Sequence, residues 1–252
     1  MKTKNRIWFC PLIVIGFVLI FTNSCKKDEA NNNSGIIFNP NLTYGTITDI
    51  DGNMYKTIQI GTQTWMAENL KTTHYLNGDL IGTTTPATLD ISGEITPKYQ
   101  WAYNGNESNV ATYGRLYTWY AVTDSRNVCP TGWHVPTDAE GHTLVLTVDA
   151  EAQVVFGDES SIAGGKLKEV GTMHWTSPNT GADNSNGFTA IPSGDRYPYG
   201  SFRNLGNYSI WWSSTEGDIA NAWYRSTSYD YTVVIRSYSM ESFGSSVRCV
   251  KD

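Results

Sequence analysis

The sequence predicts an α+β domain built mainly from short strands. Runs of β-branched and aromatic residues alternate with turn segments rich in Gly, Asn and Pro, and few stretches repeat apolar residues at helical spacing. Strands accompanied by few long helices are typical of α+β domains. Aromatic residues make up 13% of the chain and charged residues 17%, a composition that favours a packed core over a disordered chain.

The first 24 residues have the layout of a secretory signal peptide. Basic residues (Lys2, Lys4 and Arg6) precede an apolar run over residues 7–21. As a helix this run would extend about 22 Å, which is shorter than the ~30 Å hydrocarbon core of a bilayer. We therefore expect a lipoprotein-type signal peptide over residues 1–24 and no membrane-spanning helix.

A cysteine follows the apolar run directly. Cys25, preceded by Thr-Asn-Ser, resembles the lipobox of bacterial lipoproteins in a relaxed form, which implies cleavage before Cys25 and a diacylglyceryl group on its sulfur. The alternative is an ordinary secreted protein with a free thiol. Residues 26–29 (Lys-Lys-Asp-Glu) are similar to a surface-export tag, or are a charged spacer. We expect a lipid anchor in the outer membrane, with the protein on the cell surface. If residues 26–29 are only a spacer, the anchored protein can equally face the periplasm.

The excess of acidic over basic residues disfavours partners that carry many negative charges. The formal net charge is −6, and residues 25–252 hold 15 basic and 24 acidic residues. An acidic surface repels phosphate backbones, and the sequence contains no cluster of Lys and Arg. We therefore expect no nucleic-acid partner. Residues 25–43, which include an Asn-rich stretch, predict a flexible tether before a folded domain over residues 44–252.

The first expected elements of the domain are the two strands of a hairpin. Residues 45–50 and 54–60 are β-rich and flank Asp51-Gly52-Asn53, and Asp-Gly between such runs is a strong hairpin signal. The alternative is a calcium loop that uses the oxygen ligands of residues 49–53. Isoleucines stand where the closing glutamate of such a loop would fall, so we favour the hairpin turn.

Turn-rich segments separate the next elements. Residues 64–70 predict a third short element, and residues 77–110, rich in Gly, Thr, Pro and Asn, predict long loops. Residues 113–122 carry apolar side chains at helical spacing, which favours a helix. The apolar face of that helix would consist of Leu116, Trp119 and Tyr120.

A further helix is expected to begin after Thr137. Thr137 and Glu140 fit a capping box, in which the Thr hydroxyl accepts a backbone N–H and the Glu carboxylate reaches back, although Gly141 weakens the helix. A short element is expected after Gly164-Gly165. The last strands are expected at residues 222–228, 232–238 and 245–251.

The cysteines agree with an oxidising compartment. Cys10 belongs to the signal peptide and Cys25 is the lipidation candidate, so only Cys129 and Cys249 remain in the folded region, and we expect them to pair. The bond would close a loop of about 120 residues and contribute at most about 5 kcal/mol. The alternative is a reactive thiol pair, in which His134 activates Cys129.

Several segments together resemble one family. In order, they are DGNMYKTIQIGTQTWMAENL (51–70), YGRLYTWYAV (113–122), CPTGWHVPTDAE (129–140), GGKLKEVGTMHW (164–175), GFTAIPSGDR (187–196), WWSSTE (211–216) and SVRCV (246–250). From about residue 44 onwards, the chain is similar to the Fibrobacter succinogenes major paralogous (FISUMP) domain, found mostly in surface or secreted lipoproteins. The resemblance implies a C-type-lectin-like fold, shared with relatives of the formylglycine-generating enzyme, that has short strands, two or so helices and long loops.

The resemblance also implies properties of the site. In lectin-like domains a disulfide often joins the first-helix region to the final strand, as a bond between Cys129 and Cys249 would. The calcium signatures of lectins are absent from the sequence, and so are the two closely spaced cysteines that the enzyme's copper site needs. Neither chemistry is expected here. One departure from the family is Gly141, where a large aromatic residue, commonly Trp, is usual.

Catalytic and metal motifs are not apparent in the sequence. The four histidines show none of the local pair spacings that zinc sites use. The sequence also contains neither a G-x-S-x-G elbow nor a Walker-type glycine loop. We therefore expect no catalytic residue, no metal and no cofactor.

The Trp211-Trp212 pair marks a candidate contact surface. Successive side chains of a strand face opposite sides, so one Trp is expected in the core and the other towards a loop or solvent. An exposed Trp among polar groups would suit sugar stacking, whereas the alternative buries both indoles. The candidate contact residues, with those of the Gly-rich segment upstream, are Trp212, Ser213, Thr215, Glu216, Arg196, Tyr199 and Arg203.

These observations predict a non-catalytic binding or adhesion module, anchored by lipid in the membrane, whose partner is a glycan or a surface protein. The expected contact regions are the loops 77–110 and 193–210 and the segment 211–216, because rigid scaffolds usually present ligand sites on loops. Two alternatives come from other classes. One is an enzyme-like relative of the formylglycine-generating group, and the other is a structural component of a surface assembly.

Overall fold

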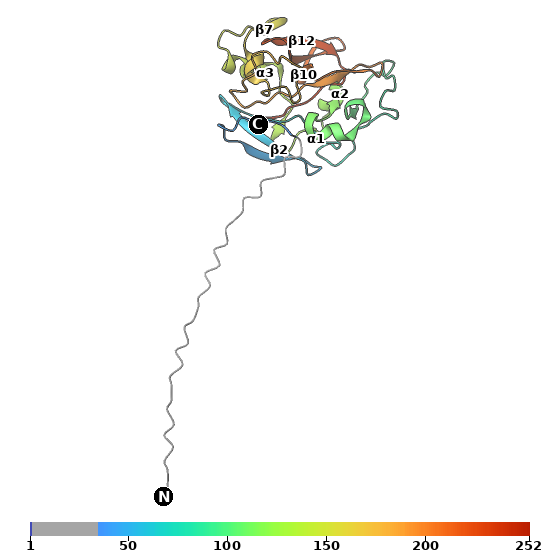
Figure 1. Ribbon diagram of the computed structural model, residues 1–252. Helices are drawn as coiled ribbons and strands as arrows, with labels where there is room; N and C mark the ends of the chain where they lie inside the picture. The colour runs from blue at the N-terminus through green and yellow to red at the C-terminus, as the bar shows by residue number, and fades with distance from the viewer. Residues whose placement is uncertain (2–34) are drawn as a thin grey trace. The chain divides into compact units, whose positions relative to one another are not determined.

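Two antiparallel sheets carry the fold of the computed structural model, which describes Met1 and residues 35–252 (Figure 1). The predicted signal peptide, the lipidation site at Cys25 and the beginning of the predicted tether lie outside the described residues. Among the residues that are described, none of the helices combines the length and the apolar character needed to cross a bilayer.

The first sheet has five strands in the order β1-β2-β3-β13-β6. They are β1 (Gly45–Thr48), β2 (Met54–Ile60), β3 (Gln63–Met66), β13 (Val250–Lys251) and β6 (Trp133–His134). The predicted hairpin is confirmed, because β1 and β2 pair antiparallel. Asp49 Oδ1 accepts the backbone N–H groups of Asp51 and Asn53 at 3.0 and 2.9 Å, so this carboxylate closes the turn.

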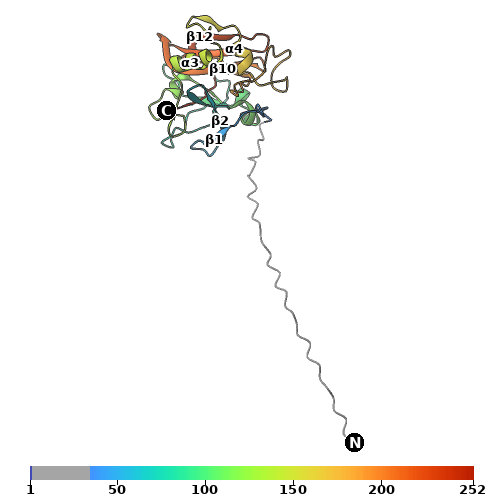
Figure 2. The same cartoon turned by 90° about the vertical axis from the view of Figure 1, so that its left-hand side faces the viewer.

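The second sheet has four strands in the order β10-β11-β12-β7 and lies above β2 in both views (Figures 1 and 2). They are β10 (Tyr208–Asp218), β11 (Asn221–Ser228), β12 (Val234–Met240) and β7 (Gly157–Ser160). Two of the three predicted final strands are confirmed here. The third was wrong over residues 245–249, because Ser245 and Ser246 form only isolated bridges with Tyr117 and Trp211.

Short helices and two-stranded ribbons fill the connections of the described chain. The helices are α1 (Val110–Tyr113), α2 (Trp119–Val122), α3 (Asp138–Val148) and α4 (Ala163–Leu167), with 3-10 turns η1 (Tyr103–Gly105) and η2 (Glu107–Asn109). The ribbons pair β4 (Gln100–Trp101) with β5 (Leu116–Tyr117) and β8 (Ser193–Arg196) with β9 (Phe202–Leu205). The fold is therefore mixed and sheet-rich.

Of the two helices predicted from the sequence, one is confirmed and the other is not. The capping box at α3 is confirmed: Glu140 N donates to Thr137 Oγ1 at 3.2 Å, and Thr137 N donates to Glu140 Oε2 at 2.8 Å. The single helix predicted over residues 113–122 was wrong. Gly114 adopts φ 73° and ends α1, after which the chain forms β5 before α2 begins.

The core consists of two apolar clusters that share strand β10. Trp212 packs in one cluster with Tyr117 and Phe243, and Trp211 packs in the other with Phe188. The indoles are 0% and 3% exposed. The strand does send the two side chains to opposite sides, but both faces of β10 are covered. The expectation that one Trp faces a loop or solvent was therefore wrong, and the alternative that buries both is confirmed.

The domain begins earlier than the sequence predicts. Ile36 is buried, the Ile37 N–H donates to Glu169 Oε1 at 2.7 Å, and Leu42 packs against the second apolar cluster. Residues 36–43 are thus part of the packed domain, and the predicted tether boundary at residue 43 lies too late.

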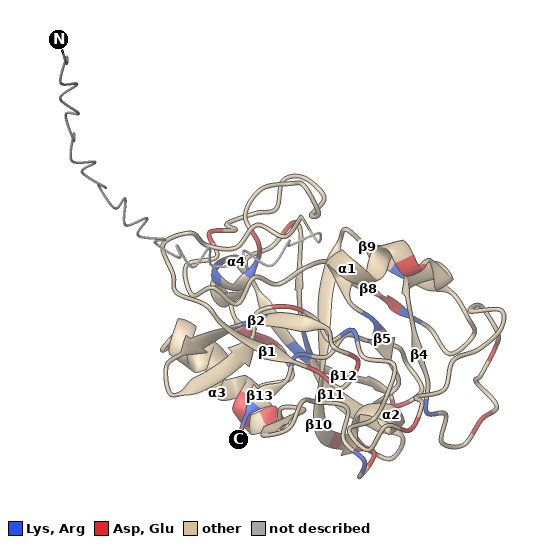
Figure 3. Cartoon of the chain, turned by 90° about the horizontal axis from the view of Figure 1, so that it is seen from below, with Lys and Arg blue, Asp and Glu red and all other residues tan. Residues whose placement is uncertain are grey.

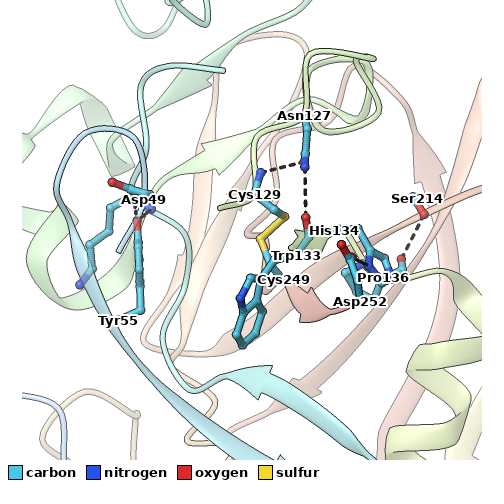
Figure 4. The surroundings of a disulfide bond; sticks show 11 residues. Asp49, Tyr55, Asn127, Cys129, Trp133, His134, Pro136, Ser214, Cys249 and Asp252 are labelled. Carbon is cyan, nitrogen blue, oxygen red and sulfur yellow. Dashed lines mark hydrogen bonds and ion pairs between the residues drawn. A yellow bond between two sulfur atoms is a disulfide. The ribbon is translucent and has the colours of Figure 1, made fainter. Parts of the chain in front are cut away.

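The predicted disulfide is present. Cys129 and Cys249 are joined, with their Cα atoms 6.0 Å apart, so the segment before β6 is tied to the residue before β13 (Figure 4). Asn127 orders this segment, because its Oδ1 accepts the Cys129 N–H at 2.9 Å and its Nδ2 donates to Trp133 O at 3.1 Å. The alternative of a reactive thiol pair is wrong for this structure, since both sulfur atoms are bonded.

Buried cations hold the irregular segments together. Lys168 Nζ donates to three backbone carbonyl oxygens at 2.8–2.9 Å, those of Thr180, Ser228 and Tyr231. Arg248 donates to Asn69 Oδ1 and to carbonyls of the 188–189 segment. Burial lowers the pKa of Lys168 to about 8 and that of Arg248 to about 9. These side chains provide donors for backbone carbonyl groups, most of which lie outside the strands.

Candidate functional site

Two of the three predicted contact regions pack against each other. Gly200, in the turn between β8 and β9, adopts φ 93°, and a Cβ atom there would lie 1.9 Å from the carbonyl oxygen of Thr88. The Ile91 N–H also donates to Pro198 O at 2.9 Å. The β8–β9 hairpin and the loop 77–110 therefore form one continuous structure.

Arg196 fastens these two regions from inside. Its guanidinium donates to Ala87 O at 2.9 and 3.1 Å and to Leu89 O at 2.6 Å, and it lies 4.0 Å from the centroid of the Trp101 ring. The side chain is buried, which lowers the pKa of Arg196 to about 10. Arg196 therefore supports the loop from behind and does not present its charge to solvent, in contrast to its predicted role in ligand contact.

A pocket of about 240 Å³ opens in this supported loop. It is lined by residues 83–87, Trp101, Ala102, Gly105 and Glu107. Thr84 Oγ1 accepts the Trp101 Nε1–H at 2.8 Å, so the indole and one hydroxyl fix each other at the wall. Thr83 and Thr85 are exposed, which leaves their hydroxyls available to a ligand.

Glu107 supplies the only charged group of the pocket lining. Its Oε1 accepts from Arg115 Nη1 at 3.1 Å, and Arg115 is itself held by Gln100 Oε1 and Lys71 O, both at 3.0 Å. A carboxylate oriented in this way is a strong hydrogen-bond acceptor at a fixed position. Together with the exposed threonine hydroxyls, it makes a site suited to a small polar ligand rich in hydroxyl groups.

The remaining predicted contact residues lie outside this pocket. Trp212 and Ser213 are buried, and Ser213 Oγ donates to Trp223 O at 3.0 Å. Thr215 Oγ1 accepts the Asp138 N–H at 3.0 Å and so braces the start of α3. Tyr199, Arg203 and Glu216 are exposed. The segment 211–216 therefore serves mainly as structure.

The β8–β9 hairpin approaches Trp212 inside the core. Tyr197 and Trp212 both contact Phe243, with ring centroids 5.1 and 6.1 Å apart respectively. Arg203 lies 3.5 Å from the Tyr197 ring centroid and pairs with Asp195, so its exposed guanidinium is also engaged. The pairing of ring and cation stabilises the hairpin.

A buried charge cluster lies where α3 crosses the second sheet. Arg225 pairs with Glu159 at 2.7 and 2.9 Å and with Asp138 at 3.0 Å. Arg236 also pairs with Asp138, at 2.8 Å, and His142 Nδ1 lies 2.7 Å from Glu159 Oε1. Burial alone would raise the pKa of Asp138, but the two guanidinium groups outweigh it and lower that pKa.

This cluster accounts for the unusual glycine in α3. A Cβ atom at Gly141 would lie 2.4 Å from Arg225 Nη1, which is itself pinned by two carboxylates. The guanidinium thus occupies space that a side chain at position 141 would need. The sequence contained one signal for this site, the glycine at a position where the resembling family carries a large aromatic residue. The acidic and basic partners themselves were missed, because they are distant in sequence.

His134 links the start of α3 to the end of the chain. Burial by itself lowers the pKa of His134, but hydrogen bonds from Nδ1 to Asp252 Oδ1 (2.6 Å) and from Nε2 to Glu140 Oε1 (2.8 Å) outweigh it and raise that pKa. The stabilisation by protonated His134 is therefore complete below pH ~6.5 and is lost as the pH rises through the higher folded-state pKa.

An NMR titration of the His134 ring tests this link. We expect its midpoint to lie above the ordinary histidine value, and Asp252→Asn to move the midpoint downward because one carboxylate acceptor is lost. His174, which pairs with Glu169 and not with Asp252, serves as the internal control. An unchanged His134 midpoint in the variant would show that Asp252 does not contribute to the raised pKa of His134.

Within the described chain, neither a band of basic residues nor a cluster of metal-ligand groups marks a further candidate site. Seen from below, basic and acidic residues are dispersed over the cartoon, and no stripe of basic residues is visible (Figure 3). Within residues 35–252, no group of three or more His, Cys, Asp or Glu side chains is placed to hold a metal ion. The pocket lined by residues 83–107 is therefore the leading candidate.

Comparison with known proteins identifies the family. The pattern of the Fibrobacter succinogenes major domain matches residues 58–251, which include the disulfide, the pocket and both sheets except β1 and the first half of β2. No curated protein and no solved structure matches the chain. Because the match covers well over half of the sequence, the chain belongs to the Fibrobacter succinogenes major domain family.

Proposed function

We propose that the chain is a non-catalytic binding module of the bacterial surface that holds a glycan in the pocket of residues 83–107. The observation that carries the proposal is the pocket itself, with its exposed threonine hydroxyls and one oriented carboxylate around a buried tryptophan. A small number of polar groups at fixed positions is the usual means of orienting a small polar ligand such as a sugar.

The dimensions of the pocket favour a glycan over a protein partner. At about 240 Å³ it is smaller than the ~300–1,000 Å³ of pockets for drug-sized ligands. A stable protein interface, by contrast, buries about 800 Å² on each partner. The pocket thus suits a single sugar residue, such as the end of a glycan chain.

Attachment to the outer membrane through lipidated Cys25 belongs to the same proposal. The apolar run before Cys25 supports it, and so does the short distance along the chain to Ile36, the first buried residue of the domain. About ten residues reach at most ~35 Å when fully extended. The domain would therefore stay close to the membrane surface, where glycans of the envelope and of neighbouring cells are concentrated.

A C-type-lectin-like fold is also part of the proposal. It is supported by the disulfide, which joins a segment just before α3 to the residue before the last strand. The second support is that a long loop and a few short elements, braced by a hairpin, form the candidate site. The disulfide and the long loops are features that the family resemblance implies for lectin-like domains.

A glycan panel tests the proposal. We expect the purified protein to retain a small set of glycans, and Glu107→Gln to weaken their binding by about 10- to 100-fold, because a hydrogen bond to a charged group contributes about 1.5–3 kcal/mol. Glu94→Gln is the matched control, since Glu94 is exposed in the same loop but does not line the pocket.

Two results would count against the pocket. One is that no glycan on a broad panel binds. The other is that a glycan binds equally well to the wild-type protein, to Glu107→Gln and to Thr83→Phe, in which a ring would fill the pocket. The second result would leave a binding module but would move its site elsewhere.

A further inference from the structure

A second pocket, of about 350 Å³, lies between the turn after β2 and the ends of two helices. It is bordered by the end of β2 and the first residue of the turn after it (58–61), the C-terminal end of α3 (147–148), Lys166 of α4 and the loop residues 185–186, with Leu42 completing the wall. Its volume falls within the ~300–1,000 Å³ range of small-molecule sites.

One part of the lining is aliphatic. Ile58 and Ile60 are buried and belong to the second apolar cluster, against which Leu42 and Val148 also pack. No aromatic ring contributes to the lining. Leu42 and Val148 are half-buried, so an aliphatic ligand body would cover the part of this wall that still faces water, which is favourable.

The polar part of the lining is positively charged. Lys166 is the only charged residue in the lining, and its Nζ donates to Val148 O at 3.3 Å. That contact places the cation at the C-terminal end of α3, where a positive charge is favourable. An ammonium group has three donors, so two of them remain for a ligand. Within the described chain, the lysines in ion pairs are Lys71 and Lys98, and Lys166 has no carboxylate partner there.

A second donor in the lining also lacks an acceptor. Asn186 Oδ1 accepts the Phe188 N–H at 3.0 Å, which fixes the side-chain amide. Its Nδ2 is buried and has no hydrogen-bond partner among the described residues. An unsatisfied buried donor is costly, and each one in a native structure calls for an explanation.

We propose that this pocket binds a small aliphatic carboxylate, with its anionic end at Lys166 and Asn186 and its hydrocarbon part on the aliphatic wall that includes Leu42 and Val148. The carboxylate provides the acceptors that the ammonium and the amide lack, and the hydrocarbon matches the aliphatic lining. Two sources share this chemistry: a free aliphatic acid, and the C-terminal carboxylate of a peptide ending in an aliphatic residue. The site is independent of the glycan pocket, because the two pockets share no residue.

Titration of the full-length protein with hexanoate, followed by NMR chemical shifts, tests the proposal. We expect saturable shifts at residues of the pocket, and hexanol to bind at least tenfold more weakly because it lacks the negative charge. Lys166→Gln should weaken hexanoate binding at least tenfold. Lys251→Gln is the matched control, because it removes the same charge at an exposed position outside the pocket.

Asn186→Asp keeps the inference testable if Lys166→Gln disturbs folding. The new carboxylate can still accept the Phe188 N–H, but it repels an anionic ligand, so hexanoate binding should fall at least tenfold. A peptide ending in Ala-Leu with a free carboxylate, compared with its C-terminal amide, distinguishes the two sources. Absence of saturable hexanoate binding, equal binding of hexanol, or indifference to both pocket variants would overturn the proposal.

Discussion

Glu159→Gln is expected to lower the free energy of unfolding by about 3–5 kcal/mol, because it removes one partner of a buried ion pair. Glu159 accepts two hydrogen bonds from Arg225, at 2.7 and 2.9 Å, and lies 2.7 Å from His142 Nδ1. The substitution preserves the size of the side chain. It leaves the guanidinium buried with a single carboxylate, that of Asp138.

Urea unfolding measures this loss directly. Glu151→Gln is the matched control, since Glu151 is exposed on the loop that follows α3 and should change the free energy of unfolding by less than about 0.5 kcal/mol. If the two variants were equally stable, the cluster around Arg225 would contribute nothing to the fold. Gly141 would then need another explanation.

Replacing both Cys129 and Cys249 with serine is expected to cost about 2–5 kcal/mol. The bond closes a loop with a sequence separation of 120 residues, so its loss frees a large part of the unfolded chain. Both sulfur positions are buried, and the serine hydroxyls would also need hydrogen-bond partners. The effect should be concentrated at the C-terminal end, because β13 holds its place in the first sheet through only one or two residue pairs with each neighbour.

Thermal unfolding with and without a reductant checks this expectation. The wild-type midpoint should fall when the disulfide is reduced, whereas the double serine variant should melt at a lower temperature that the reductant does not change. Equal midpoints for the wild type under both conditions, with the bond shown to be reduced, would contradict a stabilising role for the disulfide.

Local signals in the sequence predicted local structure well. The Asp-Gly turn, the capping box at Thr137 and Glu140 and the strands β11 and β12 of the second sheet depend on neighbouring residues, and all are present. The pairing of Cys129 with Cys249 followed by elimination and is also present. The helix predicted over residues 113–122 failed because Gly114 adopts φ 73° and β5 pairs with β4, a contact that apolar spacing does not encode.

The candidate sites depend on contacts between distant segments, which the sequence does not display. The loop 77–110 was predicted as a contact region, but its pocket exists because Arg196, about 110 positions away, binds the carbonyls of Ala87 and Leu89. Trp212 was predicted as a contact residue from its polar neighbours. Those neighbours bond to backbone or buried groups instead, and a core covers each face of β10.

Hydrogen–deuterium exchange on the protein, with and without a glycan selected from the panel, tests the central claim most directly. The account predicts that the glycan slows exchange in residues 83–107 and in the β8–β9 hairpin that braces them, and leaves the segment 211–216 unchanged. Protection confined to residues 211–216, or the same exchange with and without a bound glycan throughout residues 83–107, would contradict the assignment of this pocket as the binding site.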